Sequence, residues 1–126
     1  MDVLIVDDHR IFREGFERVL DVIERIQKIK LAENGEEALL MIGQKVPDLV
    51  FMDVQMKVLD GIATTKLAIK SHPDLKIIGL SQYDDDMHVI KMYEAGASGY
   101  INKHSGIQEI KIAVDVVMDG DKYFDP

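Results

Sequence analysis

The side chains best suited to chemistry are acids and a lysine that follow short apolar runs. Asp53 comes directly after the apolar residues 49–52, and the loop behind it closes on Asp60-Gly61. A short apolar run bounded by turn signals predicts a strand buried on both faces. In open α/β sheets, ligands bind at the carboxyl ends of such strands. Asp53 is therefore the first functional candidate, and the alternative is an aspartate that merely starts a turn.

Four more polar side chains stand at equivalent positions after other apolar runs. Asp7 and Asp8 follow residues 3–6, Ser81 ends the run at 77–80, and Lys103 follows the last run. Because parallel strands point their carboxyl ends the same way, we expect these groups to gather at one edge of a sheet. Each also has an ordinary structural explanation: a helix N-cap for either acid, a turn for the serine, and a solvated surface position for the lysine.

Three carboxylates at one edge would repel each other, so a raised pKa, a cation or both must compensate. Hard oxygen ligands suit Mg²⁺, which keeps several waters and favours phosphate chemistry. With its charge balanced in this way, Asp53 could act as a nucleophile and form an acyl phosphate. Lys103 and the Ser81 hydroxyl could then hold the transferred phosphoryl oxygens.

The segments that must position these residues alternate between strand and helix. A three-layer α/β/α domain with a parallel sheet and helices on both faces is the arrangement that such alternation predicts. Apolar runs predict the strands and helical periodicity predicts the helices. The strands are expected at residues 3–6, 29–31, 49–52, 77–80 and 99–101, and the helices at 10–25, 36–44, 61–71, 84–95 and 107–118.

Bulk properties exclude several classes of protein. The 126 residues, 47% of them hydrophobic, fit one domain with its own core. The formal net charge of −8 disfavours direct binding to nucleic acid or to an anionic membrane. Cysteine is absent, so disulfides and thiolate metal sites are excluded, which fits a reducing cytoplasm. The N-terminus shows no basic leader, and no apolar run approaches the roughly 18 residues of a membrane span.

The combination of these motifs resembles the receiver domain of bacterial two-component response regulators over essentially the whole chain. That resemblance implies a flavodoxin-like (βα)5 fold, with a five-stranded parallel sheet in the order 2-1-3-4-5. The residues that carry it are Leu4-Ile5-Val6-Asp7-Asp8, Asp53 with Met56 and Asp60-Gly61, Leu80-Ser81, and Ala95-Gly96-Ala97-Ser98-Gly99-Tyr100 up to Lys103.

The resemblance also implies a metal-assisted phosphoacceptor. Asp53 would accept the phosphoryl group. Asp8 and Asp53 would bind Mg²⁺ through their side chains, and Gln55 through its backbone carbonyl. Asp7 would act indirectly, through water or by orienting its neighbours.

The same resemblance implies a switch that reads the phosphoryl group. Ser81 and Lys103 would contact the phosphoryl oxygens, and Ser81 with Tyr100 would form the switch pair. The signal would emerge on a surface built from residues 84–95, 99–102 and 106–119, where Met87, Met92 and Tyr93 could meet a partner.

Residues 7–15 and 117–126 resemble the NarL/FixJ-type branch, in which the receiver precedes a helix-turn-helix DNA-binding domain. The expectation is a receiver over residues 1–126, with a DNA-binding output domain following it in a longer transcription regulator. The implied partners are a sensor histidine kinase and a second receiver after phosphorylation. DNA would be reached only through the output domain, and no membrane partner is expected.

Three positions depart from the usual receiver pattern. Lys57 stands where most receivers have proline, which loosens the loop and adds a cation beside the acids. Gln82 replaces a small residue, and His104 stands where many receivers have a cis-proline. His104 is expected to be a helix-start or surface residue, and His9 is expected to be structural rather than catalytic.

Some other classes of function would need residues that this chain lacks. An aspartyl-phosphate hydrolase would carry a second acid two residues after the nucleophile, where this chain has Gln55. A flavodoxin-like cofactor binder would need a Gly/Ser/Thr-rich phosphate loop, whereas Asp7-Asp8-His9 would repel a phosphate. A stand-alone or pseudo-receiver that acts by protein binding stays open. The prediction is a signalling domain whose only reactions are self-phosphorylation and autodephosphorylation.

Overall fold

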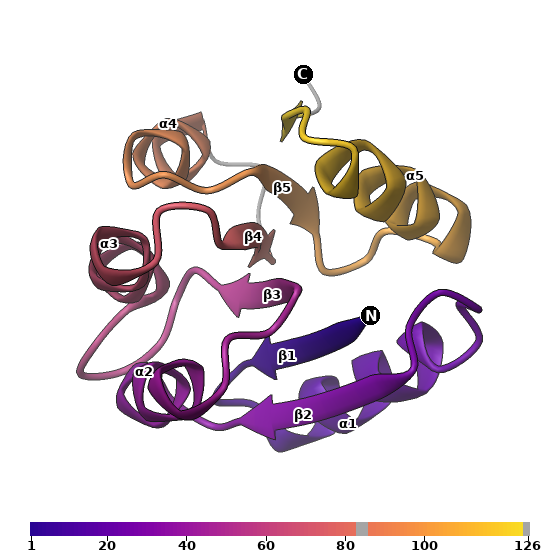
Figure 1. The fold of residues 1–126 in the computed structure, drawn as a ribbon, viewed down its shortest axis with the longest axis horizontal. Helices are drawn as coiled ribbons and strands as arrows, with labels where there is room; N and C mark the ends of the chain where they lie inside the picture. The colour runs from indigo at the N-terminus through magenta and orange to yellow at the C-terminus, as the bar shows by residue number, and fades with distance from the viewer. Residues whose placement is uncertain (83–85, 125–126) are drawn as a thin grey trace.

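The apolar runs form the strands of one parallel sheet in the computed structural model, which describes residues 1–82 and 86–124. The strand order is β2-β1-β3-β4-β5-β6, so the predicted order 2-1-3-4-5 is confirmed and one short strand is added at the edge (Figure 1). The strands are β1 (Asp2–Val6), β2 (Lys28–Ala32), β3 (Leu49–Asp53), β4 (Lys76–Ser81), β5 (Gly99–Asn102) and β6 (Tyr123–Phe124).

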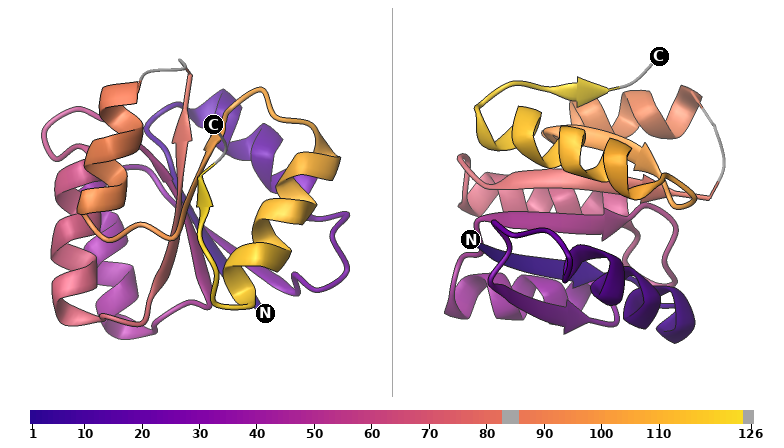
Figure 2. Two further views of the ribbon diagram at one scale, coloured as in Figure 1. Left: turned by 90° about the horizontal axis from the view of Figure 1, so that it is seen from above. Right: turned by 90° about the vertical axis from the view of Figure 1, so that its right-hand side faces the viewer.

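Helices cover both faces of this sheet, which confirms the three-layer prediction. One face packs against α1 and α5, and the other against α2, α3 and α4 (Figure 2). Among the described residues, none of the helices combines the length and hydrophobicity that a membrane crossing requires. The helices are α1 (Arg10–Leu20), α2 (Gly35–Gln44), α3 (Gly61–Ser71), α4 (Asp86–Glu94) and α5 (Ile107–Met118).

The register of the central strands brings the polar strand ends together. All five residues of β3 are buried, as expected for a strand covered on both faces. Val6 pairs with Met52, and Asp53 pairs with Leu80, so β1, β3 and β4 end close to the same level. The residues that follow these strands therefore share one edge of the sheet.

The first helix is shorter than its hydrophobic pattern predicted. It ends at Leu20 rather than near residue 25, and the chain then turns, with the Ile23 N–H donating to the Leu20 carbonyl at 3.0 Å. Ile23 and Ile26 are buried from this turn, so the apolar pattern continues after the helix has ended. Ile11, an apolar residue in the first turn of α1, is 90% exposed.

The other differences between the predicted and the observed elements lie in the C-terminal half of the chain. The predicted helix start at Asp84-Asp85 lies outside the described residues, and α4 is described from Asp86 to Glu94. The two residues of β6 were not predicted. They run parallel to β5, with the Tyr123 N–H donating to the Ser98 carbonyl at 2.9 Å. The tail therefore covers the edge of the sheet that β5 would otherwise present.

Candidate functional site

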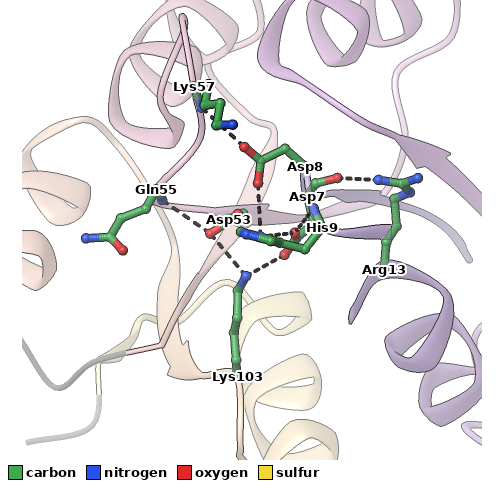
Figure 3. Close-up of polar contacts among 8 residues, drawn as sticks. All are labelled: Asp7, Asp8, His9, Arg13, Asp53, Gln55, Lys57 and Lys103. Atoms are coloured by element: carbon green, nitrogen blue, oxygen red, sulfur yellow. Dashed lines mark hydrogen bonds and ion pairs between the residues drawn. The ribbon is translucent and has the colours of Figure 1, made fainter. Parts of the chain in front are cut away.

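Three carboxylates meet at the carboxyl edge of β1 and β3, as the sequence predicted. Asp7 is fully buried and Asp53 is 2% exposed, whereas the Asp8 side chain is 21% exposed. Together with His9, they place one ligand atom each within 4.8 Å of one another (Figure 3). Carboxylates this close, two of them out of water, require a compensating positive charge.

Asp53 is only partly satisfied by its surroundings. Its Oδ1 accepts the Gln55 N–H at 3.2 Å and lies 3.4 Å from the Lys103 Nζ. Its Oδ2 is buried and has no hydrogen-bond partner among the described residues. Burial, and then the Asp7 charge, raise the pKa of Asp53 to about 7, although Lys103 and the Gln55 amide oppose this. The carboxylate therefore has one oxygen without a hydrogen-bond partner and too little compensating charge.

Lys103 supplies the cation within the described part of the site. Its Nζ lies 2.7 Å from Asp7 Oδ2, and its side chain is only 6% exposed. The alternative of a solvated surface lysine is therefore wrong. Its backbone N–H donates to the Ser81 carbonyl at 2.7 Å, which ties the end of β4 to the segment after β5. Asp7, Asp53, Ser81 and Lys103 are thus brought together, as predicted.

The explanation of Asp7 and Asp8 as helix N-caps is also wrong. The N-cap residue of α1 is His9, and no side chain caps this helix by a hydrogen bond. Instead Asp7 Oδ1 accepts the His9 N–H at 2.7 Å, which is a local turn. The His9 ring, expected to be structural, has its Nδ1 3.0 Å from Asp8 Oδ1 and 3.3 Å from Asp7 Oδ1. Its adjacency to Asp8 was the signal that could have placed it in the site.

The loop after β3 contributes backbone donors. The Lys57 N–H lies 3.3 Å from Asp8 Oδ2, a contact that a proline at this position could not make. The Gln55 side chain points away from the acids (Figure 3). Its predicted role as a carbonyl ligand stays a prediction. The loop closes tightly, because a Cβ on Gly61 would collide with the Asp53 carbonyl, so that position requires glycine.

Arg13 is a site neighbour that the sequence reasoning missed. It is 8% exposed, and its guanidinium donates to the Asp7 carbonyl at 2.6 Å and lies 3.9 Å from Glu33. The signal was its place between Phe12 and Phe16, on the helix face that packs against the sheet. Arg13 anchors α1 to the loop that carries the acids (Figure 3).

The predicted switch residues are both buried. Ser81 is 3% exposed and Tyr100 is 8% exposed. The Tyr100 ring packs over Gly79, since a Cβ there would stand 3.0 Å from Tyr100 Cδ1 and 3.0 Å from Met92 Cε. The Tyr100 ring therefore lies in an inward position against Gly79. The sequence reasoning did not predict this contact.

The donor set fits a hard divalent cation. Asp7, Asp8 and Asp53 each supply a carboxylate oxygen, and these oxygens lie within 4.8 Å of one another. Oxygen-rich, partly open sites of this kind suit Mg²⁺. Two of the three residues that depart from the usual receiver pattern, Gln82 and His104, are exposed, and the His104 N–H donates to Asn102 Oδ1.

Comparisons with known proteins agree on one family. Residues 3–115 match the response regulator receiver domain. The chain is 37% identical over 124 residues to the response regulator GacA of Pseudomonas protegens, covering 98% of this chain and 58% of that protein. It is 34% identical over 126 residues to the transcriptional regulatory protein DegU of Brevibacillus brevis, covering 100% of this chain and 53% of that protein. The chain thus spans little more than half the length of these relatives.

A solved structure shows the same fold. A crystal structure of a LuxR-family two-component response regulator from Aurantimonas sp. superposes with a TM-score of 0.93 at 28% identity. The match covers 99% of this chain and 89% of that one. The fold and the branch expected from residues 7–15 and 117–126 are therefore confirmed.

Proposed function

Since the chain belongs to the response regulator receiver domain family of two-component systems, in its NarL/FixJ branch, we propose that it is a phosphorylation-controlled switch whose acceptor is Asp53. The observation that carries the proposal is the buried Asp53 Oδ2. It has no hydrogen-bond partner among the described residues, while Asp7, Asp8 and Lys103 surround the carboxylate. An oxygen in this position can form a bond to phosphorus without breaking an existing contact.

Mg²⁺ would be held by the Asp8 and Asp53 side chains and by the Gln55 carbonyl, with Asp7 acting indirectly. When bound, the ion would neutralise charge on the transferring phosphoryl oxygens. The protein's own residues position the other groups of the site. Asp7 holds the Lys103 Nζ at 2.7 Å, beside the acceptor. The burial of Asp7 and Lys103 keeps water from weakening that interaction.

In the transfer itself, an Asp53 carboxylate oxygen forms a bond to the phosphorus as the bond from phosphorus to the donor's leaving atom breaks. The donor in the proposal is a phosphohistidine of a sensor histidine kinase. The Lys103 ammonium and the Ser81 hydroxyl would contact the transferred oxygens, where charge-assisted hydrogen bonds are strongest. Hydrolysis of the acyl phosphate at the same site returns the carboxylate and phosphate. No other enzymatic activity is proposed.

The proposed output is a shift in the surface formed by α4, β5 and α5. The phosphoryl group adds charge and acceptor oxygens, and Ser81 with Tyr100 would convert them into a population shift. Met87 and Tyr93 are 58% and 56% exposed on α4, whereas Met92 is fully buried and belongs to the core. Exposed apolar side chains on this surface support self-association after phosphorylation.

The proposal extends to a longer protein. GacA and DegU are named as regulators, and this chain spans about half of each. We place the receiver at residues 1–126, before a DNA-binding output domain that alone contacts DNA, in the cytoplasm and with no membrane partner. The alternative is a stand-alone or pseudo-receiver that acts by protein binding.

The experiment is intact-mass measurement after incubation with acetyl phosphate. The wild type should gain one phosphoryl group when Mg²⁺ is present and none when it is chelated. Asp53→Ala should gain none, while Asp74→Ala, which changes an exposed acid far along the chain, should behave as wild type. If the wild type gains nothing and binds no beryllofluoride, the pseudo-receiver alternative replaces the proposal.

A further inference from the structure

The ammonium group of Lys103 has an aromatic ring as its third neighbour. Its Nζ lies 4.5 Å from the centroid of the Phe12 ring, in addition to its contacts with Asp7 and Asp53. An ammonium has three donors, and the Lys103 side chain is only 6% exposed. Two donors face the carboxylates, and the face of the ring covers the side of the ammonium that water would otherwise solvate.

The position of this ring is fixed by other aromatic side chains. Phe12 lies in the first turn of α1 and stacks on Phe16, with the ring centroids 5.4 Å apart and 18° between the ring planes. Phe16 in turn meets Phe51 edge-on at 5.0 Å. Phe51 is fully buried on β3, two residues before Asp53. Aromatic contacts therefore connect the strand that carries the acceptor to the ring that covers the lysine.

An aromatic ring and a carboxylate interact with the lysine ammonium in different ways. The ring attracts the ammonium through its quadrupole and has no strong acceptor oxygen. It can therefore hold Lys103 at the acceptor without competing strongly for the donors that a phosphoryl group needs. A leucine in this place would fill similar space and pack on Phe16, but it would offer the ammonium no electrostatic attraction.

We propose that Phe12 is a positioning residue for Lys103, holding the ammonium over the acceptor by a cation–π contact that its aromatic neighbours keep in place. This role rests on the proposed function of Lys103 as a phosphoryl contact. It goes beyond packing, because it depends on the charge distribution of the ring and not only on its shape.

The first test needs no phosphoryl donor. A double-mutant cycle in urea unfolding compares Phe12→Leu, Lys103→Met and the double variant. We expect Phe12→Leu to cost less stability when Lys103 is already methionine, because the ring–ammonium attraction is then absent. Additive costs would overturn the proposed contact, whether or not the protein accepts a phosphoryl group.

The second test separates charge from shape. Phe12 is replaced at a reassigned codon by phenylalanines with one, two and three ring fluorines, which progressively weaken the quadrupole with little change in size. The apparent affinity for beryllofluoride in saturating Mg²⁺ should fall stepwise, by about three- to tenfold in total. The same trifluoro ring at Phe124, whose aromatic contact is with Tyr93, is the control and should change affinity little.

The outcomes are distinguishable. An unchanged beryllofluoride affinity along the fluorinated series would overturn the positioning role, even if Phe12→Leu weakens binding through its shape. A comparable loss from the Phe124 control would also overturn it. A wild type that binds no beryllofluoride would instead refute the proposed function, and with it any role of Phe12 in the reaction.

Discussion

Keeping Asp53 ionised in the folded protein is energetically costly. Its side chain is 3% exposed, and burial together with Asp7 raises its pKa to about 7. Lys103 contacts both acids but does not cancel this effect. A buried carboxylate with too little compensating charge is poorly suited to stabilising the fold, and its cost is relieved by a proton or by a nearby cation.

The pH dependence of stability should report this cost. Because the pKa is raised, folded Asp53 holds its proton more tightly than unfolded Asp53, so its contribution to stability is full below about pH 4 and is lost as the pH rises through about 7. Asp53→Asn has no such loss. In metal-free urea unfolding, the variant should gain on the wild type by on the order of 3 kcal/mol between pH 5 and pH 8.

Mg²⁺ provides the control for that measurement. The ion should stabilise the wild type more than Asp53→Asn at pH 8, since only the wild type has a charged carboxylate at position 53. A constant difference between the two proteins from pH 5 to pH 8 would show that Asp53 does not titrate in this range.

At the residue scale, the sequence predicts the clustered acids and lysine better than the side chains that pack around them. Asp7, Asp53 and Lys103 could be placed because each follows a strand whose end is set by an apolar run. Arg13 and Phe12 could not, because their contacts depend on how far α1 rotates against the sheet. A helical pattern gives the buried face of a helix but not which side chain on it reaches a given backbone carbonyl or ammonium.

At the scale of elements, the loop between β3 and α3 stores strain. Val58 has a φ of 67° and is the only non-glycine residue with a positive φ in the described ranges 1–82 and 86–124. This conformation is costly for a β-branched residue, and its side chain is 97% exposed, so it gains little in return. The loop is fixed on both sides, because the Gly61 N–H donates to the Val54 carbonyl and Asp60 caps α3.

Relieving that strain should stabilise the protein. Val58→Gly removes the clash and should raise the free energy of unfolding by about 1 kcal/mol. Val46→Gly is the matched control, because Val46 is also in a loop and lacks a positive φ. It should lower stability through the greater freedom of the unfolded chain. A loss of stability from Val58→Gly similar to that of the control would refute the strain.

The packing of β4 against β5 makes a second prediction. In Gly79→Ala the new Cβ would stand 3.0 Å from Tyr100 Cδ1 and Met92 Cε, so we expect the ring to move outward and a cost of about 1–3 kcal/mol. NMR of the Tyr100 ring protons would detect the movement. Gly43→Ala on α2 is the control, where nothing lies within 4 Å and a gain of up to about 1 kcal/mol is expected. An unmoved ring would show that Gly79 does not set the position of Tyr100.

Some elements of the fold could be predicted from the sequence and others could not. Strands such as β3 could be placed because a fully buried strand leaves an uninterrupted apolar run. The end of α1 could not, because Ile23 is buried from a turn and extends the helical pattern beyond the helix. Periodicity records which residues are buried, and it does not record the backbone conformation that buries them.

At the scale of the whole molecule, the alternation of strands and helices was enough to predict the layers and the edge that carries the site. It could not predict β6, because two residues are too few for any periodic signal. Their role emerges only in the folded sheet, where Tyr123 pairs with Gly99 and Phe124 meets the Tyr93 ring edge-on at 5.2 Å. The C-terminal residues through 124 therefore belong to the domain.

A truncation tests that conclusion. Ending the chain after Asp121 removes β6, the Tyr123 hydrogen bond to Ser98, and a 3.3 Å contact from the Tyr123 hydroxyl to Glu109. The free energy of unfolding should fall by on the order of 2 kcal/mol. Tyr123→Phe removes only the hydroxyl and should cost less than half as much. An unchanged urea midpoint after truncation would mean that β6 contributes nothing to the fold.

The measurement that tests the central claim most directly is chemical location of the phosphoryl group. After incubation with acetyl phosphate and Mg²⁺, borohydride reduces an aspartyl phosphate to homoserine, which peptide mass spectrometry can assign to one position. We expect homoserine at position 53 alone, and none when Mg²⁺ is chelated. Homoserine at position 7 or 8, or a phosphorylated protein with no reducible aspartate, would contradict Asp53 as the acceptor.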